Sequence, residues 1–170
     1  EGHRRGVATV RRITEHCVRL GIEQLTLYCL SSENWRRPEA EISFLMQLLE
    51  QYVIEERQLL MKERIRLAMI GRREGLPAGT LAEIDRTIDL CAANDGMRLC
   101  LAVNYGSRAE IVAAARRLAC DVQDGVLDPA AIDEEAFAAR LDTAGMPDPD
   151  LLVRTAGEMR LSNFLLWQCS

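Results

Sequence analysis

Apolar residues in the first half of the chain alternate between helical spacing and short continuous runs. Helical spacing over residues 7–20, closed by Gly21, predicts a helix. The apolar run at residues 24–31 predicts a strand. A broad apolar stripe from Ile42 to Val53 predicts a long helix that begins near Pro38. The first half therefore predicts a helix, a strand and a second helix, in that order.

The second half continues the alternation of strands and helices. Three predicted helices begin with a hydroxyl residue that can serve as N-cap: Thr80 with Glu83, Ser107 with Glu110, and Ser162. We predict strands at residues 65–70, 97–103 and 151–153, and helices at residues 81–93, 107–120, 133–141 and 163–167.

This repeated alternation predicts the fold class. Strands that are separated by helices pair in parallel, and helices then cover both faces of the sheet. We therefore expect an α/β fold with an open, mainly parallel sheet and helices on both faces. With 170 residues and 48% hydrophobic content, the chain is expected to form a single domain, residues 1–170.

Composition and charge exclude several classes of function. The net charge is −5, and no basic stripe is interleaved with aromatic residues, so nucleic acid is not an expected partner. No apolar run approaches the roughly 20 residues that a bilayer span needs. The six cysteines are dispersed without a C-x-x-C pair, which argues against zinc and disulfides. We expect a cytoplasmic protein, and a peripheral contact with the inner face of a membrane stays open.

Two arginines and a serine near the C-terminal end suggest anion binding. Arg154 follows the predicted strand, while Arg160 and Ser162 lie at the start of the predicted helix. Guanidinium groups match phosphate oxygens in pairs, and helix N-termini favour anions. The alternative is that the arginines form ordinary surface ion pairs with Asp150 and Glu158. Spacing alone does not decide between these two interpretations.

A second polar cluster follows the strand predicted at residues 24–31. Loops after the carboxyl ends of parallel strands form the ligand crevice of open sheets, so both clusters are expected to face one pocket. The alternatives are a turn at the two serines and a surface tryptophan that packs on Pro38. The cluster comprises Ser31, Ser32, Glu33, Asn34, Trp35, Arg36 and Arg37.

Three segments in order, LTLYCLSSENWRRPEAE, LAVNYGSRAEIV and DLLVRTAGEMRLSNFLLWQ, resemble the cis-prenyltransferases, most closely the bacterial undecaprenyl diphosphate synthases (isoprenyl transferases). The resemblance covers essentially the whole chain. It implies a homodimeric α/β enzyme with a hydrophobic tunnel. Such an enzyme condenses isopentenyl diphosphate units in cis onto an allylic diphosphate such as farnesyl diphosphate. The long-chain polyprenyl diphosphate would be the lipid carrier for cell-wall sugars, and Mg2+ would be the cofactor.

The resemblance also implies roles for individual residues. It places the diphosphate of isopentenyl diphosphate against Arg154, Arg160, Leu161 and Ser162. Asn34 matches the position usually assigned as proton acceptor, but an amide is barely basic and is better suited to orient the substrate or a diphosphate oxygen that takes the proton. The substrate site would be lined by His3, Ser31, Ser32, Glu33, Trp35 and Arg37, with Glu41 beside it. Asn104 and Arg108 would face the same crevice, and structural support is the alternative role for these two.

The metal ligands and the tunnel follow from the same resemblance. The family's metal-binding aspartate and glutamate correspond to positions before Glu1 and after Ser170, so we expect no metal ligand within this chain. The 170 residues alone are then expected to bind diphosphate without elongating it. The apolar stripe of the long helix, with Met97 and Leu99 opposite, could line the tunnel, although core packing is the simpler role. The alternative function is a non-catalytic subunit that supports a catalytic partner.

Overall fold

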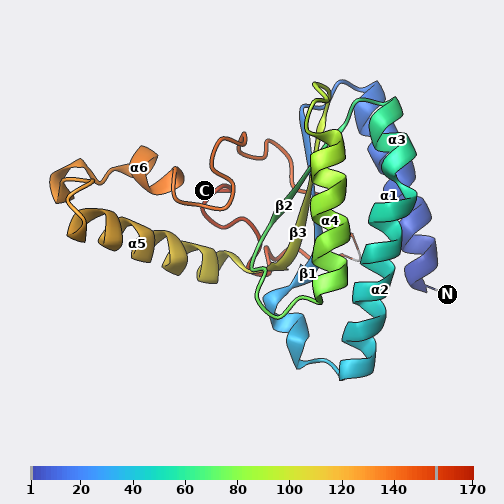
Figure 1. Cartoon of the computed structure of the whole chain (residues 1–170), viewed down its shortest axis with the longest axis horizontal. Helices are drawn as coiled ribbons and strands as arrows, with labels where there is room; N and C mark the ends of the chain where they lie inside the picture. Colours follow the sequence, from blue (N-terminus) through green and yellow to red (C-terminus); the bar gives the residue numbers. More distant parts are fainter. Residues whose placement is uncertain (1, 156) are drawn as a thin grey trace. The chain divides into compact units, whose positions relative to one another are not determined.

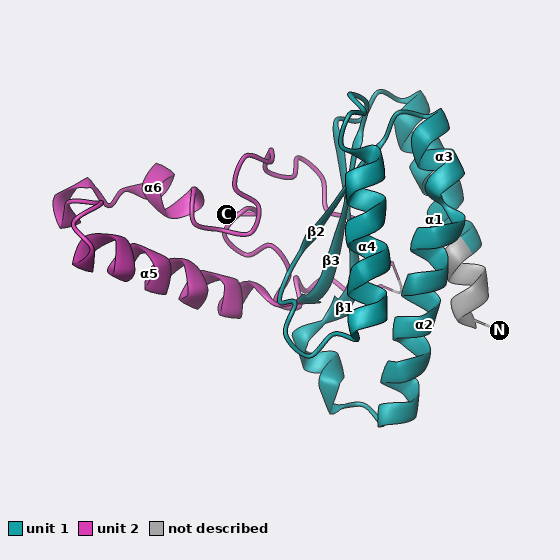
Figure 2. Ribbon diagram, in the orientation of Figure 1, with its two compact units in different colours: residues 1–104 teal, residues 105–170 magenta. Residues whose placement is uncertain are grey.

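The computed structural model describes residues 2–155 and 157–170, with the backbone alone for residues 2–7. Two compact units divide the chain, unit 1 at residues 1–104 and unit 2 at residues 105–170 (Figure 2). Each unit is described by itself below. The elements that begin in unit 1 are α1 (Gly2–Arg19), β1 (Gln24–Ser31), the 3-10 helix η1 (Ser32–Arg36), α2 (Glu39–Glu55), α3 (Arg57–Lys62), β2 (Arg66–Ile70), α4 (Ala78–Cys91) and β3 (Arg98–Tyr105).

A three-stranded open sheet, in the order β1-β3-β2, is the centre of unit 1. Strands β2 and β3 are parallel, with Arg66 opposite Arg98 and Ile70 opposite Ala102. This topology needs helical crossovers between strands, and α2 to α4 supply them. The predicted α/β fold with an open parallel sheet flanked by helices is confirmed.

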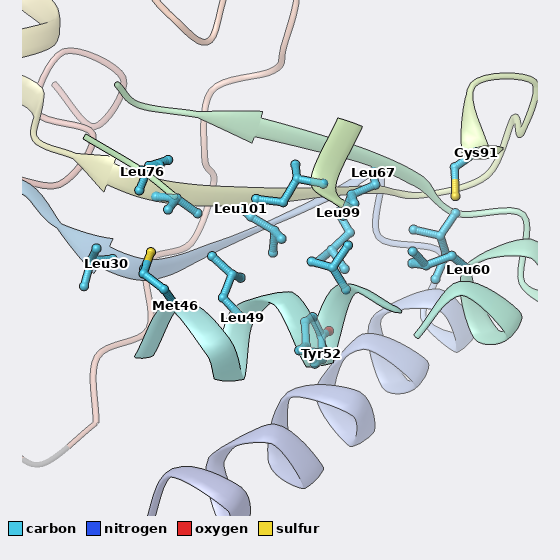
Figure 3. Packing of buried hydrophobic residues seen from close by; sticks show 14 of the residues in the cluster. Leu30, Met46, Leu49, Tyr52, Leu60, Leu67, Leu76, Cys91, Leu99 and Leu101 are labelled. Carbon is cyan, nitrogen blue, oxygen red and sulfur yellow. The ribbon is translucent and has the colours of Figure 1, made fainter. Parts of the chain in front are cut away.

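The hydrophobic core of unit 1 lies between the sheet and the helices α1, α2 and α4, which pack on one face of it (Figure 1). Side chains alternate along a strand, so Leu99, Leu101 and Val103 all point to this face, and each is at most 1% exposed. Met46 and Leu49 of α2 point toward the strands (Figure 3).

Several element boundaries follow from backbone constraints. Pro38 directly precedes α2, and Glu39 and Glu41 occupy the first turn, where the helix dipole favours acidic side chains. Gly96 donates its N–H to the carbonyl of Arg64 at 2.8 Å. A Cβ atom at Gly96 would lie 2.6 Å from that oxygen, so only glycine fits this turn into β3.

The predicted capping box at Thr80 and Glu83 is wrong. Helix α4 begins at Ala78, directly after Pro77, which places Thr80 inside the first turn. The Thr80 hydroxyl donates instead to Glu50 Oε2 of α2 at 3.0 Å. Because proline suits the first positions of a helix, Pro77 decides where α4 starts.

Unit 2 contains α5 (Ser107–Gln123), the 3-10 helix η2 (Pro129–Ala131) and α6 (Glu134–Ala138). The strand that we predicted at residues 151–153 is absent from the described residues. Leu151 and Val153 are 78% and 77% exposed, so the apolar pattern there reflects no burial within the chain. The helix predicted at residues 163–167 is likewise absent from the part of the chain that the structure describes. Positive φ angles at Ser162 (49°), Asn163 (59°) and Leu165 (47°) are incompatible with a right-handed helix.

Candidate functional site

The loop that follows β1 is folded into the 3-10 helix η1, which organises the first polar cluster. The amide oxygen of Asn34 accepts a hydrogen bond from the Ser31 backbone N–H at 2.9 Å. This bond fixes the orientation of the Asn34 amide, because a backbone N–H can only pair with the oxygen. Asn34 Nδ2 makes no hydrogen bond to the residues that the structure describes. The side chain therefore presents a donor.

Trp35 connects this loop to the strand β3. Its indole ring packs against the hydrophobic core, and Nε1 donates to Asn104 Oδ1 at 2.6 Å. The contact to the core is deeper than the surface packing on Pro38 that we considered as an alternative. Asn104, in turn, donates from Nδ2 to the carbonyls of Arg72 and Glu74, each at 3.1 Å. The loops after β1 and β2 are thus joined through one buried amide.

The remaining loop residues lie at the same end of β1. Arg37 pairs with Glu41 of α2, with 2.6 Å between Nη1 and Oε1, and this links the end of the loop to the first turn of the helix. Glu33 is exposed. Burial raises the pKa of Tyr28 to about 12, and the charge of Glu33 adds to the shift.

An apolar cavity of about 270 Å³ lies in unit 1, between β1 and α2. Burial raises the pKa of Tyr52, so this phenol at the wall is neutral. Met97 and Leu99 belong to the core cluster and are not among the lining residues. The cavity is lined by Val10, Leu27, Tyr28, Cys29, Leu30, Leu45, Met46, Leu48, Leu49 and Tyr52.

The second polar cluster, in unit 2, brings together Arg154, Arg160 and Ser162. Arg154 Nη1 donates to Ser162 Oγ at 2.6 Å and to the carbonyl of Arg160 at 2.7 Å. Arg160 pairs with Glu158 at 3.0 Å, in agreement with the surface ion-pair interpretation for this arginine. All of these side chains are exposed, and an exposed ion pair contributes only about 0–1 kcal/mol. We call Arg154, Arg160, Leu161 and Ser162 the arginine cluster.

The segment that follows the arginine cluster is anchored on the start of α5. The Ser107 N–H donates to the Asn163 carbonyl, and the Arg108 N–H donates to Asn163 Oδ1, both at 2.8 Å. The Ser107 hydroxyl accepts from the Leu166 N–H at 3.0 Å. The predicted capping box of Ser107 with Glu110 is therefore wrong, since Asn163 caps the first turn of α5.

Glu110 is the buried carboxylate of this anchor, with 4% of its surface exposed. It accepts hydrogen bonds from the Tyr105 hydroxyl, the Asp142 N–H and the Gln168 side chain. Burial is the largest influence on this group and raises its pKa. The anchor thus holds the residues on either side of the arginine cluster in unit 2.

The structure accounts for the predicted site residues in two groups. Ser31 to Arg37 are brought together in unit 1, and the arginine cluster is brought together in unit 2. His3 lies on α1, but its side chain falls outside the described residues. The prediction from sequence missed Asn163 as a helix cap, because the N–H that its side chain caps, that of Arg108, lies 55 residues earlier in the chain.

Neither a cluster of metal ligands nor a membrane-spanning helix occurs among the residues that the structure describes. No three His, Cys, Asp or Glu side chains of these residues lie together as metal ligands. None of the described helices combines the length and the apolar content that crossing a bilayer requires.

Comparison with known proteins identifies the family. The profile described as "Putative undecaprenyl diphosphate synthase" matches residues 1–170. An isoprenyl transferase of Rhodopirellula baltica is 51% identical over 170 residues, which cover 100% of this chain and 70% of that relative. Lavandulyl diphosphate synthase from Lavandula x intermedia, solved with dimethylallyl diphosphate, has a TM-score of 0.96 and 41% identity, with 99% of this chain and 73% of that chain covered.

A "probable undecaprenyl diphosphate synthase" from Campylobacter jejuni gives a TM-score of 0.83 and 36% identity, with 97% of this chain and 75% of that chain covered. Fold and sequence agree on the class of protein, an isoprenyl transferase. The chain belongs to the undecaprenyl diphosphate synthase family of cis-prenyltransferases.

Proposed function

We propose that this protein condenses isopentenyl diphosphate in cis with an allylic diphosphate, such as farnesyl diphosphate, to give a long-chain polyprenyl diphosphate that serves as a lipid carrier. Both units are then parts of one catalytic domain, and the enzyme is a cytoplasmic homodimer that contacts a membrane peripherally to release its product. The observation that carries the proposal is the apolar cavity of unit 1. Along β1 its lining residues end at Leu30, directly before the polar loop that starts at Ser31.

This juxtaposition suits an amphiphilic substrate. A prenyl chain is apolar along its length and carries a diphosphate at one end. The cavity offers leucine and methionine side chains from β1 and α2, while the adjacent loop offers hydroxyl, amide and guanidinium donors. Burial of the prenyl chain would contribute roughly 25 cal/mol for each Å² removed from water.

The arginine cluster is proposed to bind the diphosphate of isopentenyl diphosphate. Arg154 already holds the Ser162 hydroxyl, so a guanidinium and a hydroxyl are presented together. Among the described residues, the Arg160 guanidinium is held by the exposed pair with Glu158, and a diphosphate can compete for it. The expected help from a helix N-terminus does not apply, because residues 163–167 are not helical.

The reaction requires stabilisation of charge more than a nucleophile. Breaking the allylic C–O bond leaves a carbocation and a diphosphate, and positioned donors stabilise the growing negative charge. The Asn34 oxygen is already engaged by Ser31, so the Nδ2 donor is the group available to a diphosphate oxygen. We propose that Asn34 orients this diphosphate and that a diphosphate oxygen takes the proton released on condensation.

Magnesium is the proposed cofactor, since it neutralises diphosphate oxygens in such reactions. The described residues include no three clustered side chains that could serve as its ligands.

The test is the loss of activity on removal of the arginine cluster from the full-length enzyme. Arg154→Ala and Arg160→Ala each remove hydrogen bonds worth about 1.5–3 kcal/mol to a charged group, so kcat/KM for isopentenyl diphosphate should fall by more than tenfold. Arg86→Ala is the control, because Arg86 is equally exposed and pairs only loosely with Glu83. Incorporation of labelled isopentenyl diphosphate measures the effect. Unchanged kinetics in both variants would refute the role of the arginine cluster, whereas a parent protein without activity would favour a non-catalytic subunit.

A further inference from the structure

Asn104 is a buried amide whose side chain is fully engaged. It is 3% exposed and lies near the carboxyl end of β3. Its oxygen accepts from Trp35, and its Nδ2 donates to the carbonyls of Arg72 and Glu74. Its own carbonyl accepts from the Arg72 N–H at 3.3 Å. These bonds fix the ring of Trp35 and bring three chain segments together at Asn104.

The three segments are the loop after β1, the loop after β2 and the carboxyl end of β3. The loop after β1 is the polar loop that contains Asn34, and its 3-10 helix is only five residues long. A 3-10 helix of this length has few hydrogen bonds of its own and depends on tertiary contacts for its position. Trp35 supplies such a contact, since it is adjacent to Asn34 and is tied to Asn104 at 2.6 Å.

We propose that Asn104 is a positioning residue for the substrate loop and that it acts through the indole of Trp35. The inference rests on the proposed function, because it assigns Asn34 and its neighbours to the diphosphate. Asn104 itself does not touch substrate in this account. It fixes Trp35, and Trp35 holds in place the 3-10 helix in which the bond from Ser31 orients the Asn34 amide.

The backbone of Asn104 allows its amide to be removed cleanly. Its φ angle is 49°, in the left-handed region, where glycine is comfortable. Asn104→Gly therefore deletes the amide without adding backbone strain. Alanine would also delete the amide, but it would strain the backbone at this φ angle. Trp35→Phe removes the indole N–H and keeps an aromatic ring against the core.

Asn94 provides a matched control for a purely structural role. Its Nδ2 donates to the carbonyls of Leu60 and Ile65, at 3.2 Å and 2.8 Å, so it also bridges two backbone segments. Its partners belong to α3 and the residue just before β2, away from the polar loop. Asn94→Asp should lower the melting temperature and leave KM and kcat unchanged.

The test is a double-mutant cycle on the full-length enzyme. Asn104→Gly and Trp35→Phe should each lower kcat/KM by about tenfold, the size expected for one hydrogen bond. The double variant should lose no more than Asn104→Gly alone, because that variant already lacks the acceptor of the Trp35 N–H. Losses that multiply to about a hundredfold would overturn the inference.

A spectroscopic measurement tests the contact without activity. The 170-residue chain has two tryptophans, so in this chain with Trp167→Phe the emission comes from Trp35. Asn104→Gly should shift that emission and raise its quenching by acrylamide, while Asn94→Asp should change neither. An unshifted spectrum would overturn the inference.

A second variant keeps the test decisive if Asn104→Gly does not fold. Trp35→Phe keeps Asn104 and both of its bonds to the Arg72 and Glu74 carbonyls, so it should still lower kcat/KM by about tenfold, and parental kinetics in this variant would contradict the proposal. A parent enzyme that transfers no prenyl group would refute the proposed function itself. An active parent with independent effects at Asn104 and Trp35 would refute only the positioning role.

Discussion

The hydroxyl of Tyr105 donates to Glu110 Oε2 at 2.5 Å, between two residues that are 1% and 4% exposed. Tyr105 ends β3, and Glu110 lies in the first turn of α5. The phenol ring also packs edge-on against Phe164, with 6.0 Å between ring centroids. This pair joins the end of the strand to the segment that follows the arginine cluster, without a cationic partner among the hydrogen bonds described for Glu110.

Burial raises the pKa of Glu110 in the folded protein. A raised folded pKa contributes stability that is fully present below the unfolded pKa of about 4.3 and is lost as the pH rises through the folded pKa. Glu110→Gln removes this titration. The melting temperature of the parent relative to the variant should therefore fall as the pH rises above the unfolded pKa of about 4.3. Glu158→Gln, at an exposed site, is the control, and a pH-independent difference would contradict the prediction.

The contact between Ser107 and Leu166 gives a second prediction. Ser107 is fully buried, and its hydroxyl is the acceptor for the Leu166 N–H. Ser107→Ala leaves that N–H without its acceptor, which should lower the free energy of unfolding by about 1–3 kcal/mol. Because Leu166 follows the arginine cluster closely, KM for isopentenyl diphosphate should also rise.

Denaturant unfolding and steady-state kinetics measure both effects of Ser107→Ala. Ser170→Ala is a suitable control, since its exposed hydroxyl donates locally to the Trp167 carbonyl. A stable Ser107→Ala variant with parental kinetics would show that the anchor does not support the arginine cluster.

The elements of unit 1 were predicted better than those of unit 2. The local hydrophobic pattern determines the structure of unit 1, whereas contacts between residues far apart in the sequence determine much of unit 2. The apolar run at residues 24–31 coincides with β1, because its hydrophobic pattern and its burial against α2 agree. The residues from Ser162 onward follow no local pattern. Ser162, Asn163 and Leu165 have left-handed backbone angles. This segment is held by hydrogen bonds with the start of α5, such as the bond from the Arg108 N–H to Asn163, 55 residues away. Propensity carries no information about such contacts.

The candidate site shows the same division. The residue types of the polar loop and the arginine cluster are enough to indicate anion binding, because guanidinium and hydroxyl groups together suit phosphate oxygens. The direction of the Asn34 amide could not be predicted, since it depends on the bond from Ser31. The role of Asn104 as a junction depends on Trp35, 69 residues earlier in the chain, and a sequence pattern does not reveal it.

Met97 gives a third prediction, in which the core role replaces the tunnel role. It is 6% exposed, belongs to the core cluster and does not line the cavity described above. Met97→Ala should lower the free energy of unfolding by about 2–5 kcal/mol, through lost burial and the hole that remains. The product length should stay the same. Product sizing together with denaturant unfolding tests this, and longer products would restore Met97 as a tunnel residue.

Leu45 gives the opposite prediction, because it lines the cavity and is only partly buried. Leu45→Trp places a large ring in a space of about 270 Å³, so the growing chain should meet the wall earlier. We expect shorter polyprenyl products and little change in KM for isopentenyl diphosphate, whose diphosphate is assigned to the arginine cluster. Leu90→Trp is the matched control, since Leu90 is 47% exposed on α4. Products of parental length from Leu45→Trp, in a variant that melts normally, would show that the chain grows elsewhere.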